Sequence, residues 1–143
     1  MAATPNALVS PRSLNLGLVQ FLQGTDSPGT YKTLYTAGSN FDRVYGMWMT
    51  NNDPSATHLV TVQIVRGGIK YGGVALTTVE NAGFASGTPP QVLLSAALWP
   101  GCALDPNGNA YLPLLTGDLF EATYGTNLTA STLINIGCIG AVF

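Results

Sequence analysis

The chain has 143 residues and a mass of 14.9 kDa, which is enough for one domain with its own hydrophobic core. Five basic and seven acidic residues give a net charge of −2, and the charged fraction is only 8%. So few basic residues leave no stripe for binding nucleic acid, and the apolar fraction of 46% excludes a disordered protein.

The first part of the chain is predicted to be an arm followed by a strand. Residues 1–12 have no sustained periodicity and carry two prolines, so we expect an N-terminal arm, with residues 13–143 forming a single β-sandwich domain. They also lack a basic region followed by an apolar run, so no secretory signal is expected. In residues 14–21 the apolar phase changes after Leu18, which predicts a strand with a bulge near residues 17–19.

Short strands are predicted at residues 31–36 and 43–50, and a hairpin follows. Residues 57–66 and 69–76 are rich in β-branched side chains and flank Gly67-Gly68, a pair suited to a type I′ turn. Pairing Arg66 with Ile69 would place Val62 opposite Gly73. That register puts one apolar face on the hairpin, formed by Val60, Val62, Ile64, Tyr71 and Ala75.

The second half of the chain continues the β pattern. Residues 80–90 are predicted to be a loop, and residues 91–99 are the only candidate helix, with a strand as the alternative. Further strands are expected at residues 110–115, 119–124 and 132–143, the last lying inside a sheet because it is apolar and alternating. The pattern predicts an all-β fold: an antiparallel β-sandwich, jelly-roll-like, with at most one short helix.

Catalytic and metal-binding patterns are scarce. His58 is interpreted as a strand-end or surface residue, and Cys138 as a core residue that is not paired with Cys102. The D-x-N-x-N run from Asp105 to Asn109 is interpreted as a turn, because Thr116 stands where a calcium loop needs Glu. No nucleophile–base pair is evident. We therefore expect a non-enzyme with no catalytic residues, cofactor or metal and no membrane span.

The tyrosines and tryptophans allow more than one interpretation. Aromatic residues are good strand formers, so packing within and between strands is the first expectation. A protein–protein interface is the second, and a platform that stacks on carbohydrate is the third. The residues concerned are Tyr31, Tyr35, Tyr45, Trp48, Tyr71, Trp99 and Tyr111.

Several phrases of the sequence resemble a known class of protein. Residues 22–38 (LQGTDSPGTYKTLYTAG), 49–73, 86–90 (SGTPP) and 112–118 (LPLLTGD) are similar to small proteins encoded among the head genes of tailed bacteriophages. The resemblance is to jelly-roll cement, or decoration, proteins. It implies a non-enzymatic virion structural protein, made in the host cytoplasm and placed on the capsid exterior. Such a protein binds the major capsid protein shell and bridges capsomers, as a homo-oligomer such as a dimer or trimer.

Two alternatives remain open at this point. One is a receptor- or carbohydrate-binding β-sandwich module of a phage tail or fibre, and the other is a small β-barrel that holds an apolar ligand. The segments expected to contact a partner are the arm and the hairpin tip at residues 66–70. The candidate contact residues are Leu8, Val9, Arg12, Arg43, Arg66 and Lys70.

Overall fold

The computed structural model describes residues 13–38, 41–99 and 102–142, and in these residues it contains strands and no helix. Among these described residues there is therefore no helix that is long and apolar enough to cross a membrane. The described strands are β1 (Ser13–Leu22), β2 (Lys32–Thr36), β3 (Asp42–Asn51), β4 (Leu59–Arg66), β5 (Ile69–Thr77), β6 (Gln91–Val92), β7 (Ala103–Leu104), β8 (Ala110–Leu114), β9 (Leu119–Tyr124) and β10 (Leu133–Val142).

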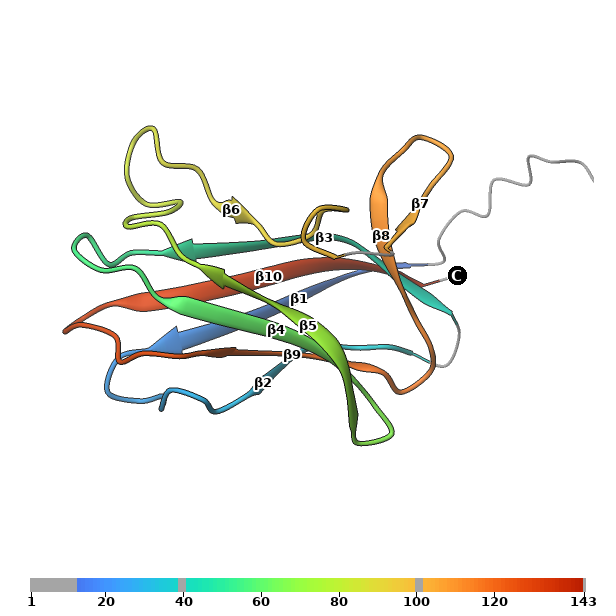
Figure 1. The fold of residues 1–143 in the computed structure, drawn as a ribbon, viewed down its shortest axis with the longest axis horizontal. Coiled ribbons are helices and arrows are strands. Elements are labelled where there is room, and N and C mark those ends of the chain that lie inside the picture. Colours follow the sequence, from blue (N-terminus) through green and yellow to red (C-terminus); the bar gives the residue numbers. More distant parts are fainter. Residues whose placement is uncertain (1–12, 39–40, 100–101, 143) are drawn as a thin grey trace, which may run out of the picture.

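The strands form two antiparallel sheets (Figure 1). The larger sheet has the order β1-β10-β3-β8-β7, with β6 pairing β3, and the smaller sheet has the order β2-β9-β4-β5. Strands pair from the two ends of the chain inward: β1 with β10, β2 with β9, β3 with β8, and β4 with β5. This rolled pairing across two sheets is the jelly-roll arrangement, so the predicted fold is confirmed.

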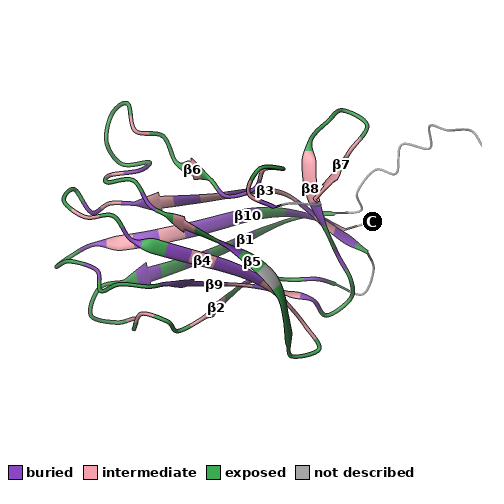
Figure 2. Cartoon of the chain, viewed as in Figure 1, coloured by how far each residue is buried: buried purple, intermediate pink, exposed green. Residues whose placement is uncertain are grey.

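The core lies between the two sheets and consists of buried apolar residues from both. Figure 2 shows buried residues, in purple, on strands of each sheet. Phe21 on β1 meets Tyr124 on β9 with ring centroids 5.2 Å apart, so the core joins the larger sheet to the smaller one. The last strand supplies a buried row, and the prediction that it lies inside a sheet is confirmed because β10 runs between β1 and β3. That row consists of Ile134, Ile136 and Cys138.

The predicted bulge in the first strand is wrong. All ten residues of β1 pair with β10 in one continuous register from Ser13↔Val142 to Leu22↔Leu133. The apolar phase change has another cause: Val19 and Phe21 face the core, whereas Leu14, Leu16 and Leu18 lie on the outer side. Both sides of the strand are apolar, and only one of them is covered by the other sheet.

The predicted hairpin is present, but its register is wrong beyond the turn. Arg66 faces Ile69 as expected, and an irregularity between Gln63 and Val65 then shifts the pairing by one residue. Val62 consequently faces Val74 instead of Gly73. The shift places Val74 in the core and leaves Tyr71 exposed, so Tyr71 and Ala75 do not share the apolar face with Val60 and Val62.

The candidate helix at residues 91–99 is absent, and the alternative, a strand, is present only at Gln91–Val92. The segment begins with the short strand β6 and continues through irregular backbone into a turn. Leu93, Leu94 and Trp99 of this segment are buried. Trp99 donates its indole N–H to the Leu93 carbonyl oxygen at 2.8 Å and packs edge-on against Phe120. The Trp99 and Leu98 N–H groups both donate to the Ser95 carbonyl oxygen, at 3.0 and 3.2 Å, which closes one turn that does not continue as a helix. The apolar residues of this segment therefore cover the core without a regular helix.

Candidate functional site

The most unusual surface is the outer side of β1, at the edge of the larger sheet. Leu14, Leu16 and Leu18 are 68%, 68% and 61% exposed. Ile139, which faces Leu16 from β10, is also exposed, so the apolar row continues onto the neighbouring strand. We call Leu14, Leu16, Leu18 and Ile139 the leucine row. An exposed apolar surface of this kind is typical of a contact with another protein.

Farther across the same outer face, aromatic side chains cover the sheet. Trp48 on β3 lies over Gly137 on β10, where an added Cβ would come within 3 Å of the indole ring. Gly137 is therefore the residue that lets the indole lie flat on the sheet. Next to it, the rings of Tyr45 and Tyr111 lie 5.5 Å apart, and the Arg43 guanidinium lies 4.7 Å from the Tyr111 ring centre.

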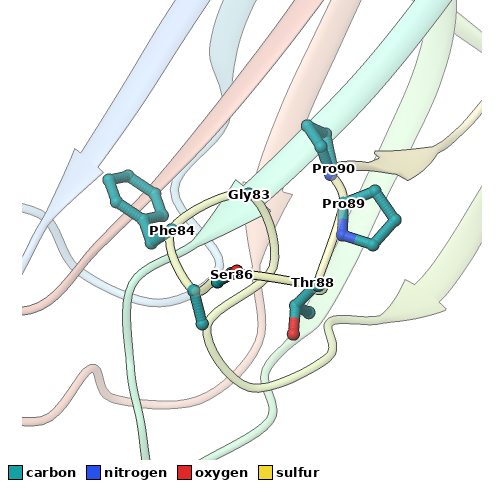
Figure 3. Close-up of a pocket in the computed structure, with 8 residues that line it drawn as sticks. Gly83, Phe84, Ser86, Thr88, Pro89 and Pro90 are labelled. Carbon is teal, nitrogen blue, oxygen red and sulfur yellow. The ribbon is translucent and has the colours of Figure 1, made fainter.

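A second exposed apolar group lies in the loop between β5 and β6 and on β6 itself. Val79, Phe84 and Val92 are about half exposed or more, and we call them the loop cluster. Residues 83–90 line a shallow hollow of about 490 Å³, with Pro89 and Pro90 along one side and the Phe84 ring projecting from the loop (Figure 3). The order of strands in the larger sheet places β10 and β3 between the leucine row on β1 and β6. Val92 faces Trp48, which faces Gly137, and Gly137 faces Leu18, so Val92 lies on the same outer face as the leucine row, with Trp48 between them.

The predicted contact residues at the hairpin tip have partners within the chain. Arg66 donates two hydrogen bonds to Asp118, at 2.7 and 2.5 Å, and lies 5.3 Å from the Tyr71 ring centre. Lys70 lies 4.9 Å from the Tyr31 ring centre. The contacts with Asp118 and Tyr31 join the hairpin to the turn before β9 and to the residue that precedes β2. Contact with a partner protein stays a prediction for both Arg66 and Lys70.

The remaining predicted contacts fall into two groups. Leu8, Val9 and Arg12 lie outside the described residues. Arg43 lies on β3, where it donates to the Tyr45 hydroxyl at 3.2 Å and faces the Phe41 and Tyr111 rings. The structure thus places Arg43 on the larger sheet and both Arg66 and Lys70 at the hairpin tip of the smaller sheet, so the three residues are not brought together into one site.

His58 directly precedes β4, so the strand-end interpretation is confirmed, but its side chain is buried and does not lie at the surface. It is 2% exposed and its Nε2 lies 3.0 Å from an Asp53 carboxylate oxygen, while its Nδ1 lies 3.2 Å from the Thr126 hydroxyl. Thr129 donates to the same Asp53 oxygen, and Ser55 donates to the other one. Sequence reasoning missed this pair because only the folded loops bring the β3–β4 segment against the β9–β10 segment.

The Asp53–His58 pair resembles the acid–base half of a catalytic triad, with Thr126 in the position of a nucleophile. Its burial argues for a structural role. A substrate would have to reach the imidazole, and that ring is covered and is held by Asp53 on one side and Thr126 on the other. Burial favours the neutral carboxyl, but the hydrogen bonds from Thr129, Ser55 and His58 outweigh it and hold the pKa of Asp53 below its usual range. The network therefore joins two loops at one end of the sandwich.

Two smaller sequence predictions can be compared with the structure. Asp105 accepts hydrogen bonds from the backbone N–H groups of Asn107 and Asn109. These hydrogen bonds close the turn that the sequence predicts. Cys138 is buried as predicted, Cys102 is partly exposed, and both thiols are free. Burial raises the pKa of the Cys138 thiol to about 11. Within the described ranges, no cluster of three His, Cys, Asp or Glu side chains is placed to bind a metal.

Together, the strand order and the exposed apolar groups define a jelly-roll β-sandwich with surfaces suited to contact with other proteins. No family model matches the chain, and no curated protein matches it. Among solved structures, the chain is similar to a chain of the cyanophage Pam1 capsid asymmetric unit. The match covers 100% of this chain and 94% of that one, at 13% identity and a TM-score of 0.48. A likeness of this size assigns no function, so the role is argued from the surfaces themselves.

Proposed function

We propose that the protein is a non-enzymatic virion structural protein that binds the outside of a major capsid protein shell and bridges neighbouring capsomers. The observation that carries the proposal is the presence of two exposed apolar groups, the leucine row and the loop cluster, with β10 and β3 between them. A bridging protein has to contact at least two partners, and apolar groups at two places on one molecule allow this. The resemblance of the sequence to phage cement proteins points to the same role.

The scarcity of charge supports the proposal. Only 8% of the residues are charged, and Arg66 is already paired with Asp118 inside the chain. The cores of protein–protein interfaces are depleted of charge and enriched in aromatic residues, as the outer face of the larger sheet is. On a shell, many copies would act together, so a modest contact area per copy suffices.

Co-sedimentation with capsid shells tests the proposal. The full-length protein is mixed with shells of its own major capsid protein assembled without it, at several salt concentrations. We expect saturable binding at a fixed ratio to the capsid protein. Because the proposed contacts are apolar, binding should persist as the salt concentration rises. Absence of binding by a protein that is folded by circular dichroism would overturn the proposal.

A pair of matched variants locates the contact. Phe84→Asp places a charge in the loop cluster, and Leu104→Asp places the same charge at a similarly exposed apolar residue on β7. We expect Phe84→Asp to weaken shell binding by at least tenfold, which corresponds to about 1.4 kcal/mol, and Leu104→Asp to bind like the wild type. Equal binding by both variants would exclude the loop cluster as a shell contact.

Carbohydrate binding is a second candidate, favoured by the Tyr45–Tyr111 pair on the outer sheet face. The position of Arg43 argues against it, because the guanidinium lies over the Tyr111 ring on which a sugar would stack. Retention on a glycan array, lost in Tyr111→Ala, would favour a receptor-binding module of a tail or fibre over the capsid role.

A further inference from the structure

The free edge of β1 lacks the features that usually protect an edge strand. Its sequence, SLNLGLVQFL, contains no charged residue and no proline, and its ten residues pair with β10 without a bulge. Natural sheets commonly block an exposed edge with charges, prolines or bulges, because its unpaired backbone groups can pair with another strand. A long, regular and uncharged edge is therefore suited to pairing.

The structure identifies which backbone groups of β1 face this free edge. The Gln20 carbonyl oxygen accepts a hydrogen bond from Lys32, and the Leu22 N–H donates to Asp26, so neither group is directed at β10. The N–H of the next residue, Gln23, points the other way and donates to the carbonyl oxygen of Thr132, which directly precedes β10. Because backbone direction alternates along a strand, the N–H and carbonyl groups of Leu14, Leu16 and Leu18 also face the free edge.

Only one end of that edge is open. Lys32 and Asp26 form a salt bridge at 2.7 Å and occupy the backbone groups of Gln20 and Leu22. Among the described strands, β10 alone pairs with β1, so the part of the edge from Leu14 to Leu18 has no strand beside it. This open segment has the sequence LNLGL, and its exposed side chains are the three leucines and Asn15.

We propose that β1 pairs antiparallel with β1 of a second copy of this chain, about a twofold axis at Leu16. Leu16 would face Leu16 of the other copy, and Leu14 would face Leu18, so that each facing pair exchanges two backbone hydrogen bonds. The two larger sheets then continue into each other, with both leucine rows on one face. The inference deepens the proposed function by assigning one of the two exposed apolar groups, the leucine row, to self-association.

The open segment is self-complementary, which is the reason for choosing a second copy as its occupant. A twofold interface brings each residue against itself or its symmetry mate, so any charge near the axis would meet a like charge. The segment has none, and the leucines at both ends and the centre meet leucines. A standard interface buries about 800 Å² per partner, which is more area than five residues of an edge strand can bury. Ile139 lies beside Leu16 and extends the apolar contact onto β10.

The N-terminal arm is the rival occupant. Twelve residues precede β1, and they could in principle fold back along the same edge. Their sequence contains Pro5 and Pro11, neither of which has an N–H to donate, so the arm would make an interrupted ladder. A second β1 offers every donor and acceptor that the open segment requires.

The mass of the full-length protein in solution, measured by light scattering without shells, tests the proposal. We expect twice 14.9 kDa for the wild type. Leu16→Lys should give the monomer mass, because it places two like charges at the axis. Leu104→Lys, at a similarly exposed residue on β7, should remain dimeric. A monomeric wild type, or a dimer unaffected by Leu16→Lys, would overturn the proposal.

Two further variants test the geometry. Leu16→Pro removes an N–H that faces the free edge and leaves the β10 ladder intact, so we expect a folded monomer by circular dichroism. Leu16→Cys places two thiols across the axis with Cα atoms about 5.5 Å apart, within disulfide range. In a Cys102→Ser background, mild oxidation should convert most of this variant into a covalent dimer. Leu104→Cys in the same background should stay largely monomeric on a denaturing gel, and equal cross-linking of the two would contradict the pairing.

The double variant Leu8→Asp/Val9→Asp tests whether the N-terminal arm, instead of β1, forms the interface between the two copies. We expect it to keep the dimer mass, and a monomer here would identify the arm as the interface and overturn the pairing of β1. The measurement is independent of the capsid proposal because it uses no shells. A dimer that fails to bind shells would contradict the proposed function and leave this inference standing.

Discussion

At the scale of single residues, the few charged side chains hold separate parts of the chain together. Asp118 is fully buried and accepts hydrogen bonds from Arg66 and from the Leu115 N–H. The hydrogen bonds from Arg66, together with that from Leu115, outweigh the effect of burial and hold the pKa of Asp118 below its usual value. The contact joins the tip of the β4–β5 hairpin to the turn before β9.

Asp118→Asn should lower the free energy of unfolding by about 1 to 2 kcal/mol at pH 7, since Arg66 is partly screened by solvent. A carboxyl with a lowered folded-state pKa stabilises the protein above its unfolded value of 3.8, and this stability is lost as the pH falls through the folded value. The difference from the wild type should therefore be full at pH 7 and shrink below about pH 4. Urea unfolding at pH 7, 5 and 3 measures it, with Glu80→Gln as the exposed control. A difference that does not change with pH would contradict the pairing.

At the scale of elements, the two sheets approach each other closely where β1 crosses β2. A Cβ added at Gly17 would lie within 3 Å of both the Leu34 carbonyl oxygen and the Cys138 sulfur. The glycine is thus needed because the β2 backbone occupies the space of a side chain. The sequence alone indicates a glycine in a strand, which is as consistent with a bulge as with a close approach.

Gly17→Ala should lower the free energy of unfolding by about 1 to 3 kcal/mol, because the β2 backbone has to move to admit a methyl group. Gly46→Ala on β3 is the matched control, since the nearest atom to its added Cβ, the Ile139 Cδ1, is 3.9 Å away. We expect the control to change stability by less than about 0.5 kcal/mol. Urea unfolding of the two variants checks this, and equal losses would show that β1 and β2 separate easily.

The elements also show where sequence reasoning was sufficient and where it failed. Strand positions at β3, β8, β9 and β10 followed from alternation and turn residues, as did the Gly67-Gly68 turn. Register and bulges did not, because they depend on the partner strand: the chain gives no local sign of the shift between Gln63 and Val65. The helix predicted at residues 91–99 failed because a short apolar run is compatible with any buried conformation.

At the scale of the whole molecule, the two sheets share one core. The first and last strands pair, and segments far apart in the chain, such as those holding Phe21 and Tyr124, are in contact. Trp48 lies on the outer face of the larger sheet, and Trp99 packs inside against Phe120 of the smaller sheet. Neither sheet can keep its inner face covered without the other, so the described part of the chain should unfold as a unit.

Two single-tryptophan variants test this cooperativity. Trp99→Phe leaves Trp48 as the reporter of the outer face, and Trp48→Phe leaves Trp99 as the reporter of the core. In each variant, the urea midpoint from fluorescence should coincide with the midpoint from far-ultraviolet circular dichroism. Fluorescence and circular dichroism midpoints that differ within one variant would show that the sheets unfold separately.

The sequence by itself determined the all-β class, the jelly-roll expectation, most strand positions and the near absence of charge, because these depend on local alternation, turn residues and composition. Only the tertiary structure decided which apolar rows are covered. Alternation shows that β1 has two apolar sides, but the other sheet covers only the side with Val19 and Phe21 and leaves the leucine row exposed. It also decided the pairing of Asp53 with His58, since that contact exists only once two loops from distant parts of the chain lie at the same end of the sandwich.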